Sequence, residues 1–232
     1  MRARLLLLLL LASLSHPILA HDLWITREGN LHTLHYGHER SGHAGAKVIE
    51  YKPEQIRQAV CFSAAGRVLA GDIGRTWPVT LRGDCAASYF VFSSGYWSKT
   101  PYGTKNLPRN EAGQVLDSWL SVESVKRIDA WGAGLAKPLG LELEIVPLDN
   151  PLSLRPGDKL HLAVYGAGKP VAGATVAYFG HPRGVTAADG RVNITLRQPG
   201  PQSIQASLET PLGDGKADRL IQATALQFEL AP

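Results

Sequence analysis

The residues most able to do chemistry are histidines, and five of the eight in the chain fall within one stretch, His21 to His43 (HDLWITREGNLHTLHYGHERSGH). Imidazole nitrogen suits zinc, copper, iron and nickel, whereas calcium and magnesium prefer oxygen donors. The density of imidazoles therefore points to a transition-metal site near the start of the chain.

His21 is the first candidate ligand because of what precedes it. Residues 1–20 combine two arginines, a short apolar run of leucines and a final Ala20, which together indicate a secretory signal peptide. Cleavage after Ala20 would make His21 the first residue. Its free amine, with a pKa of roughly 7.7–8.0, would then give up a proton to a metal far more readily than a lysine amine. One residue would thus offer two nitrogen donors.

The other donors must come from the rest of this stretch. If residues 31–36 form a strand, His32 and His35 point in opposite directions because side chains alternate between its faces. Gly37 and Gly42 free the backbone further along, so a loop could turn the neighbouring imidazoles toward one ion. A histidine in a polar edge strand is more often simply solvated, which is the competing interpretation for each. The predicted ligands, in order, are His21, His38, His43 and, in reserve, His35.

The two cysteines, Cys61 and Cys85, lack the close CxxC spacing of a thiolate metal site. In an oxidising compartment a disulfide between them is the natural prediction. With the signal peptide, it predicts a protein located outside the cytoplasm. The leader's apolar run is shorter than the roughly 20 residues that span a bilayer, so we expect no transmembrane segment in the mature chain. The net charge of +4 is too small to indicate nucleic-acid binding.

The distribution of turn residues predicts a mainly β fold with two β-sandwich regions. From residue 141 onward, short alternating strands are separated by turns such as Pro156-Gly157-Asp158. This spacing is typical of an immunoglobulin-like or prealbumin-like sandwich. We expect a signal peptide over 1–20, a β-rich metal-binding region over 21–138 and the second sandwich over 139–232.

Between Phe92 and Val115 the chain is dense in Gly, Pro, Ser and Asn, which predicts a long loop. Tyr96 and Trp97 argue against disorder there, because aromatic rings are depleted in solvated linkers. These two rings could form a wall over a bound ligand, or the loop could be an irregular cover for one end of a sandwich.

Several stretches resemble the DUF4198 family. They are the mature start HDLWI, then YGHERSGH, the loop YWSKTPYGTKNLP, and LELEIVPLDNPLSLRPGDKL followed by GKPVAGATV and TAADGR. The resemblance covers essentially all of the mature chain. It implies a bacterial periplasmic protein associated with nickel and cobalt uptake transporters. Its expected ligands here are His21, His38 and His43, and its expected partners are a metal ion or small metal chelate and a membrane transporter component.

Three other classes of function compete with nickel or cobalt transport. A copper protein could use His21 in a two-histidine brace, because copper outcompetes nickel at most nitrogen sites, and zinc is also possible. A structural or adhesion-type module would leave the histidines without a role. A hydrolase finds little support, since the chain has no GxSxG or HExxH motif. We therefore expect a binding protein and not an enzyme.

Overall fold

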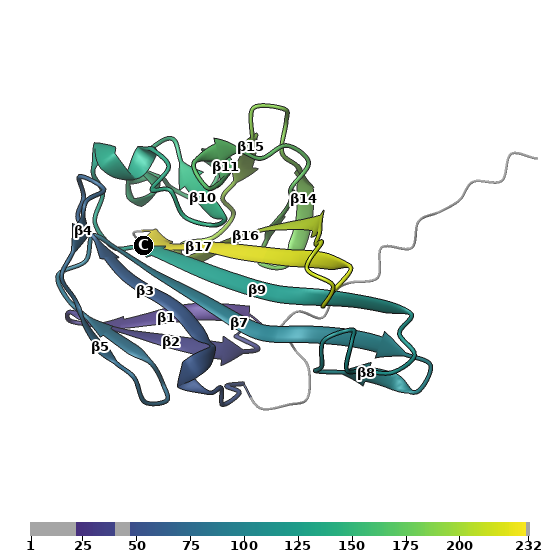
Figure 1. Ribbon diagram of the computed structural model, residues 1–232. Coiled ribbons are helices and arrows are strands. Elements are labelled where there is room, and N and C mark those ends of the chain that lie inside the picture. Colours follow the sequence, from purple (N-terminus) through teal and green to yellow (C-terminus); the bar gives the residue numbers. More distant parts are fainter. Residues whose placement is uncertain (1–21, 40–46, 231–232) are drawn as a thin grey trace, which may run out of the picture.

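The computed structural model describes residues 22–39 and 47–230, and nearly all regular structure in them is β (Figure 1). The predicted mainly β fold is confirmed, with sheets packed face to face as in a β-sandwich. Helical structure in these residues is limited to three short 3-10 turns, η1 (Pro53–Gln55), η2 (Ala133–Ala136) and η3 (Pro151–Ser153). None of the described helical segments has the length and apolar character needed to cross a membrane.

The N-terminal sheet has four strands and is built on an antiparallel hairpin that pairs Asp22 with Gly37. Its order is β1 (Asp22–Glu28), β2 (Leu31–Gly37), β6 (Thr80–Arg82) and β5 (Asp72–Gly74). Apolar residues alternate along the hairpin, so one of its faces is buried against the rest of the protein.

The central sheet has nine strands and spans almost the whole chain. Its order is β14 (His181–Val185), β13 (Thr175–Tyr178), β16 (Gly200–Pro211), β17 (Arg219–Leu230), β9 (Asp117–Ile128), β7 (Ala87–Thr100), β3 (Ile56–Phe62) and β4 (Val68–Leu69), with β8 (Gly103–Lys105) paired to β7. Neighbours are antiparallel except β17 and β9, which run parallel. Figure 1 shows β7, β9 and β17 running side by side across the middle of the molecule.

The C-terminal sheet is smaller and lies on the other side of the central sheet (Figure 1). It consists of β10 (Glu144–Pro147), β11 (Lys159–Gly166), β12 (Lys169–Pro170) and β15 (Arg191–Thr195). The central sheet is therefore sandwiched between the N-terminal and C-terminal sheets, and the protein has three β layers.

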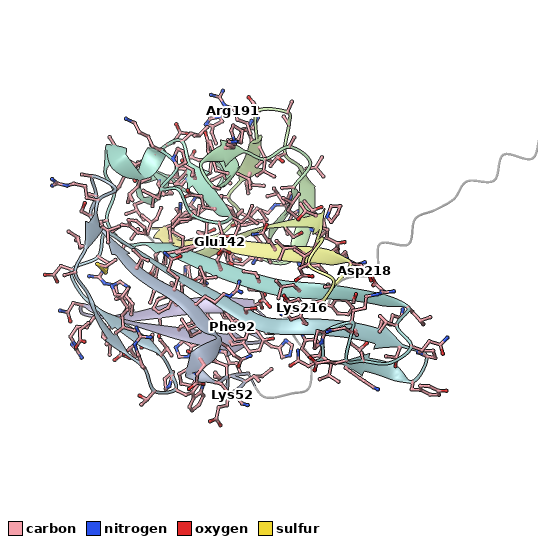
Figure 2. All side chains as sticks on the ribbon, viewed as in Figure 1. Lys52, Phe92, Glu142, Arg191, Lys216 and Asp218 are labelled. Atoms are coloured by element: carbon pink, nitrogen blue, oxygen red, sulfur yellow. A yellow bond between two sulfur atoms is a disulfide. The ribbon has the colours of Figure 1, made fainter. Side chains whose placement is uncertain are left out.

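Strand alternation gives the central sheet two apolar faces, each with its own core. On β9, Val122 packs into the core shared with the C-terminal sheet, whereas Val125 packs into the core shared with the hairpin. Phe92 of β7 also faces the hairpin, where its ring contacts Tyr36 (Figure 2). A central strand thus contributes side chains to both halves of the molecule.

The two predicted regions are joined through this sheet. The proposed boundary at residues 138/139 falls between η2 and β10 in chain order, but β17 from the second region pairs with β9 from the first over nine residue pairs. The core beneath the C-terminal sheet also contains Tyr89 and Val91 of the first region. The two β regions therefore share one continuous sheet.

The prediction of a long loop after Phe92 is wrong. Strand β7 continues to Thr100, so Tyr96 and Trp97 lie on a strand and not in a loop. The pairing with β9 shifts register between Phe92 and Gly95, which is a β-bulge that absorbs the extra residue. The glycine and serines that resemble a loop in sequence sit at this bulge, and the aromatic residues beyond it favour a strand.

The predicted disulfide is confirmed. Cys61 of β3 is bonded to Cys85, just before β7, and both residues are buried in the core beneath the hairpin. The bond ties the N-terminal part of the central sheet together.

Candidate metal-binding site

His32 and His35 lie on opposite faces of β2, as strand alternation requires. The His35 ring stacks on Trp24, with ring centroids 5.3 Å apart, and its Nε2 lies 2.9 Å from Thr26 Oγ1. Burial lowers the pKa of His35. These contacts fix the reserve ligand on the face of the hairpin that points away from the central sheet.

His38 follows β2 directly and is held by a backbone bridge. Its N–H donates to the carbonyl of Lys47 at 2.9 Å, and the Ile49 N–H donates to Tyr36. Gly37 makes this close approach possible, because its φ is +146° and a Cβ there would lie 2.4 Å from the Lys47 oxygen. The structure thus fixes the backbone of one predicted ligand. His21 and His43 lie outside the described residues.

Two carboxylates that were not predicted lie near this end of the hairpin, Asp22 close to His38 and Glu123 close to Asp22. Asp22 begins β1, and its carboxylate interacts electrostatically with the His38 imidazole and with the Glu123 carboxylate. Glu123 is on β9, where it shares the hairpin-facing side with Val125. Asp22 of β1 therefore has one potential donor near it at the end of β2 and another on β9.

The pKa values of the two acids in this cluster are raised because their carboxyl groups are partly shielded from water. Burial, and secondarily the charge of Asp22, raise the pKa of Glu123 to about 8, opposed by a hydrogen bond from Ser121. Burial also raises the pKa of Asp22, with His38 and the Glu39 backbone acting in the opposite direction. Such a pair of acids would be stabilised by a nearby cation.

Tyr36 and Phe92 form an aromatic wall beside the carboxylates. Their ring centroids are 4.7 Å apart, and burial together with the charge of Glu123 raises the pKa of Tyr36. Tyr36 therefore lies close enough to Glu123 for the two side chains to interact electrostatically.

The described residues do not complete a metal site by themselves. Within residues 22–39 and 47–230, no group of three or more His, Cys, Asp or Glu side chains is placed to hold a metal ion. The cluster of Asp22, His38 and Glu123, called the hairpin-end cluster below, needs a further donor.

Only one of the two predicted aromatic wall residues shares the face of this cluster. Trp97 pairs with Trp119, which alternates with Ser121 and Glu123 along one side of β9. Tyr96 instead pairs with Leu120 on the opposite side, and its hydroxyl donates to Asp214 at 2.7 Å. Lys216, labelled in Figure 2, lies over the Tyr96 ring at 5.8 Å from the centroid.

A comparison with known protein families shows which family the chain belongs to. The family model DUF4198, described as a domain of unknown function, matches residues 18–210. The chain belongs to the DUF4198 family. No curated protein and no solved structure gives a significant match to this DUF4198 member. The matched range includes every residue of the hairpin-end cluster.

The sequence contained a weak signal for the missed carboxylates. Glu123 is an acid on a strand whose neighbours Val122 and Val125 are both buried, and a buried strand rarely carries an unpaired acid without a reason. Asp22 directly follows the first predicted ligand. Their convergence depends on the packing of β9 under the hairpin, which no local pattern reveals.

Proposed function

We propose that this protein captures a divalent metal ion, nickel or cobalt first, outside the cytoplasm and delivers it to a membrane uptake transporter. The observation that supports the proposal is the hairpin-end cluster, in which Asp22 interacts electrostatically with the predicted ligand His38 and with Glu123. No bond of a substrate is made or broken in this function. The metal ion is the cargo.

The first predicted ligand, His21, directly precedes Asp22 in the sequence. After signal cleavage, the His21 amine and imidazole would supply the further donors that the cluster needs. Five groups, two from His21 and one each from His38, Asp22 and Glu123, would then be candidate ligands of one ion.

The chemistry of the donors suits nickel and cobalt. Imidazole binds first-row divalent metals, and carboxylates add negative charge and oxygen donors. A divalent cation would also neutralise the repulsion between Asp22 and Glu123. The same donors accept zinc or copper(II), so a copper-binding histidine brace is the alternative to be separated by experiment.

Periplasmic location and transporter delivery complete the proposal. A buried disulfide is typical of oxidising compartments, and the leader sequence is typical of export. Family resemblance suggests a transporter component as the recipient, and either a free ion or a small chelate as the incoming form.

The test is calorimetric titration of protein starting at His21 with Ni²⁺, Co²⁺, Cu²⁺ and Zn²⁺. We expect one ion per chain, with at least about tenfold weaker binding in His21→Ala, His38→Gln and Glu123→Gln, since each removes a ligand worth a kcal/mol or more. His181→Gln is the matched control, because this exposed histidine lies on edge strand β14.

An extra alanine before His21 separates the roles of the two His21 nitrogens. It keeps the imidazole but moves the free amine away, so binding should weaken if the amine is a ligand. Unchanged metal affinity in His21→Ala, His38→Gln and Glu123→Gln would rule out the hairpin-end cluster as the site. Tight binding of copper alone among the four ions would favour the copper alternative.

A further inference from the structure

A second site candidate lies at the other end of the hairpin, where the three β layers meet. It is an open cleft of about 620 Å³ whose apolar wall is formed by Ile128, Leu152 and Leu230. Clefts of this size accommodate small organic molecules. The remaining lining comes chiefly from charged side chains of β1, β9 and β17 and the residue after β9.

These side chains form an alternating chain of four charges. Arg27 Nη1 lies 3.9 Å from Asp129 Oδ1, Arg127 Nε lies 2.8 Å from the same oxygen, and Arg127 Nη2 lies 3.8 Å from Glu229 Oε2. The two middle members are largely buried, with side chains 6% exposed for Asp129 and 16% for Arg127. The inner pair is therefore joined by one hydrogen bond, from Arg127 Nε to Asp129 Oδ1, and within the described residues Asp129 Oδ2 has no hydrogen-bond partner.

The two end members of this row of charges, Arg27 and Glu229, are only weakly paired. The Arg27 side chain is 41% exposed, and its guanidinium makes no hydrogen bond to the described part of the chain. Glu229 is 60% exposed and has only the long contact to Arg127. The Asp129 oxygen that could turn toward Arg27 instead faces His32 Nδ1 at 3.8 Å. A weakly paired cationic end and a weakly paired anionic end thus line the same cleft.

We propose that this cleft binds a small zwitterion with an apolar side chain, of the class of the aliphatic α-amino acids. The ligand carboxylate pairs with Arg27, its ammonium pairs with Glu229, and its side chain packs on the partly exposed Leu152. Binding gives Arg27 and Glu229 each a close partner of opposite charge. A simple anion would leave Glu229 without a partner, and a simple amine would leave Arg27 without one.

Titration of the protein with leucine, followed by calorimetry or NMR, tests this. Leucinamide lacks the carboxylate, 4-methylpentanoate lacks the ammonium, and glycine lacks the apolar side chain. We expect saturable binding of leucine and roughly tenfold weaker binding of leucinamide and of 4-methylpentanoate, as for loss of one charge-assisted contact. Glycine should also bind more weakly than leucine, because it buries less apolar surface. Metal-free protein is used, so the result is independent of the hairpin-end cluster.

Two variants make the assignment specific. Arg27→Gln should bind leucine and leucinamide equally, and Glu229→Gln should bind leucine and 4-methylpentanoate equally. Arg75→Gln, a change at an exposed arginine outside the cleft, should behave as the unaltered protein. No leucine binding at millimolar concentration, or unchanged selectivity in both cleft variants, would overturn the proposal.

Discussion

His32 is the most unusual residue of the hairpin because its side chain is fully buried beside charged groups. Asp129 faces its ring, and Arg27 and Arg127 lie near it. Neither ring nitrogen has a partner of good hydrogen-bond geometry within the described residues, although the Gly83 backbone is close enough to favour the charged form. Burial outweighs Asp129 and lowers the pKa of His32 below 6.5.

This burial predicts a dependence of stability on pH. As pH falls below about 6.5, the unfolded chain takes up a proton at residue 32 before the folded chain does. The contribution of neutral His32 is therefore fully present above that pH and decreases below it, by at most about 1.4 kcal/mol per pH unit. Denaturant unfolding at pH 8, 6 and 5 measures the effect.

Substitution of His32 distinguishes its contribution to the pH dependence of stability from that of the other titratable groups. His32→Leu should flatten the slope between about pH 6.5 and 5. His181→Gln, at an exposed position, should leave it as it is. An identical slope in His32→Leu and the unaltered protein would show that residue 32 does not titrate differently on folding.

At the scale of elements, one buried ion pair joins β9 to β10. Lys126 Nζ lies 3.0 Å from Glu144 Oε2, with both side chains almost fully buried, and burial lowers the pKa of Lys126. The other Glu144 oxygen accepts the Leu139 N–H at 2.7 Å. The pair thus fixes the segment that leads into the C-terminal sheet.

Removing one partner should be worse than removing both charges. Lys126→Met leaves Glu144 buried without its cation and should lower the free energy of unfolding by about 3–5 kcal/mol. Adding Glu144→Gln keeps an oxygen for the Leu139 N–H and should recover part of that loss. Urea unfolding of the single and double variants measures the coupling, and purely additive losses would contradict it.

The elements also show what local sequence could predict. Alternation predicted the short strands from residue 141 onward, because it is a local pattern. The disulfide was predicted from the expected oxidising compartment. The extension of β7 past Phe92 was missed, since Ser93, Ser94 and Gly95 resemble a turn but form a bulge. Glu123 was missed because its role depends on a partner, Asp22, about a hundred residues away.

At the scale of the molecule, the central sheet is the unit of stability. Both cores draw side chains from β7, β9 and β17, so each half of the chain depends on the other. The disulfide strengthens only the first half. The domain boundary predicted from the sequence pattern at 138/139 therefore separates strands that are hydrogen-bonded to each other.

Separation of the halves gives a direct test. Fragments 21–138 and 139–232, expressed alone, should show no cooperative thermal unfolding, because each loses part of a core and one side of the β9–β17 ladder. The intact chain 21–232 should unfold in a single transition, seen by calorimetry. A sharp transition in either isolated fragment would establish an independent domain.

The parallel ladder also sets an order of events during biosynthesis. Arg219 pairs with Trp119, 100 positions earlier, so a ribosome makes β9 long before its neighbour exists. Until then one edge of β9 has unpaired backbone N–H and C=O groups, which readily pair with foreign strands. Nascent chains of this protein therefore have a period of aggregation risk, and chaperone binding during that interval would protect them until β17 is added.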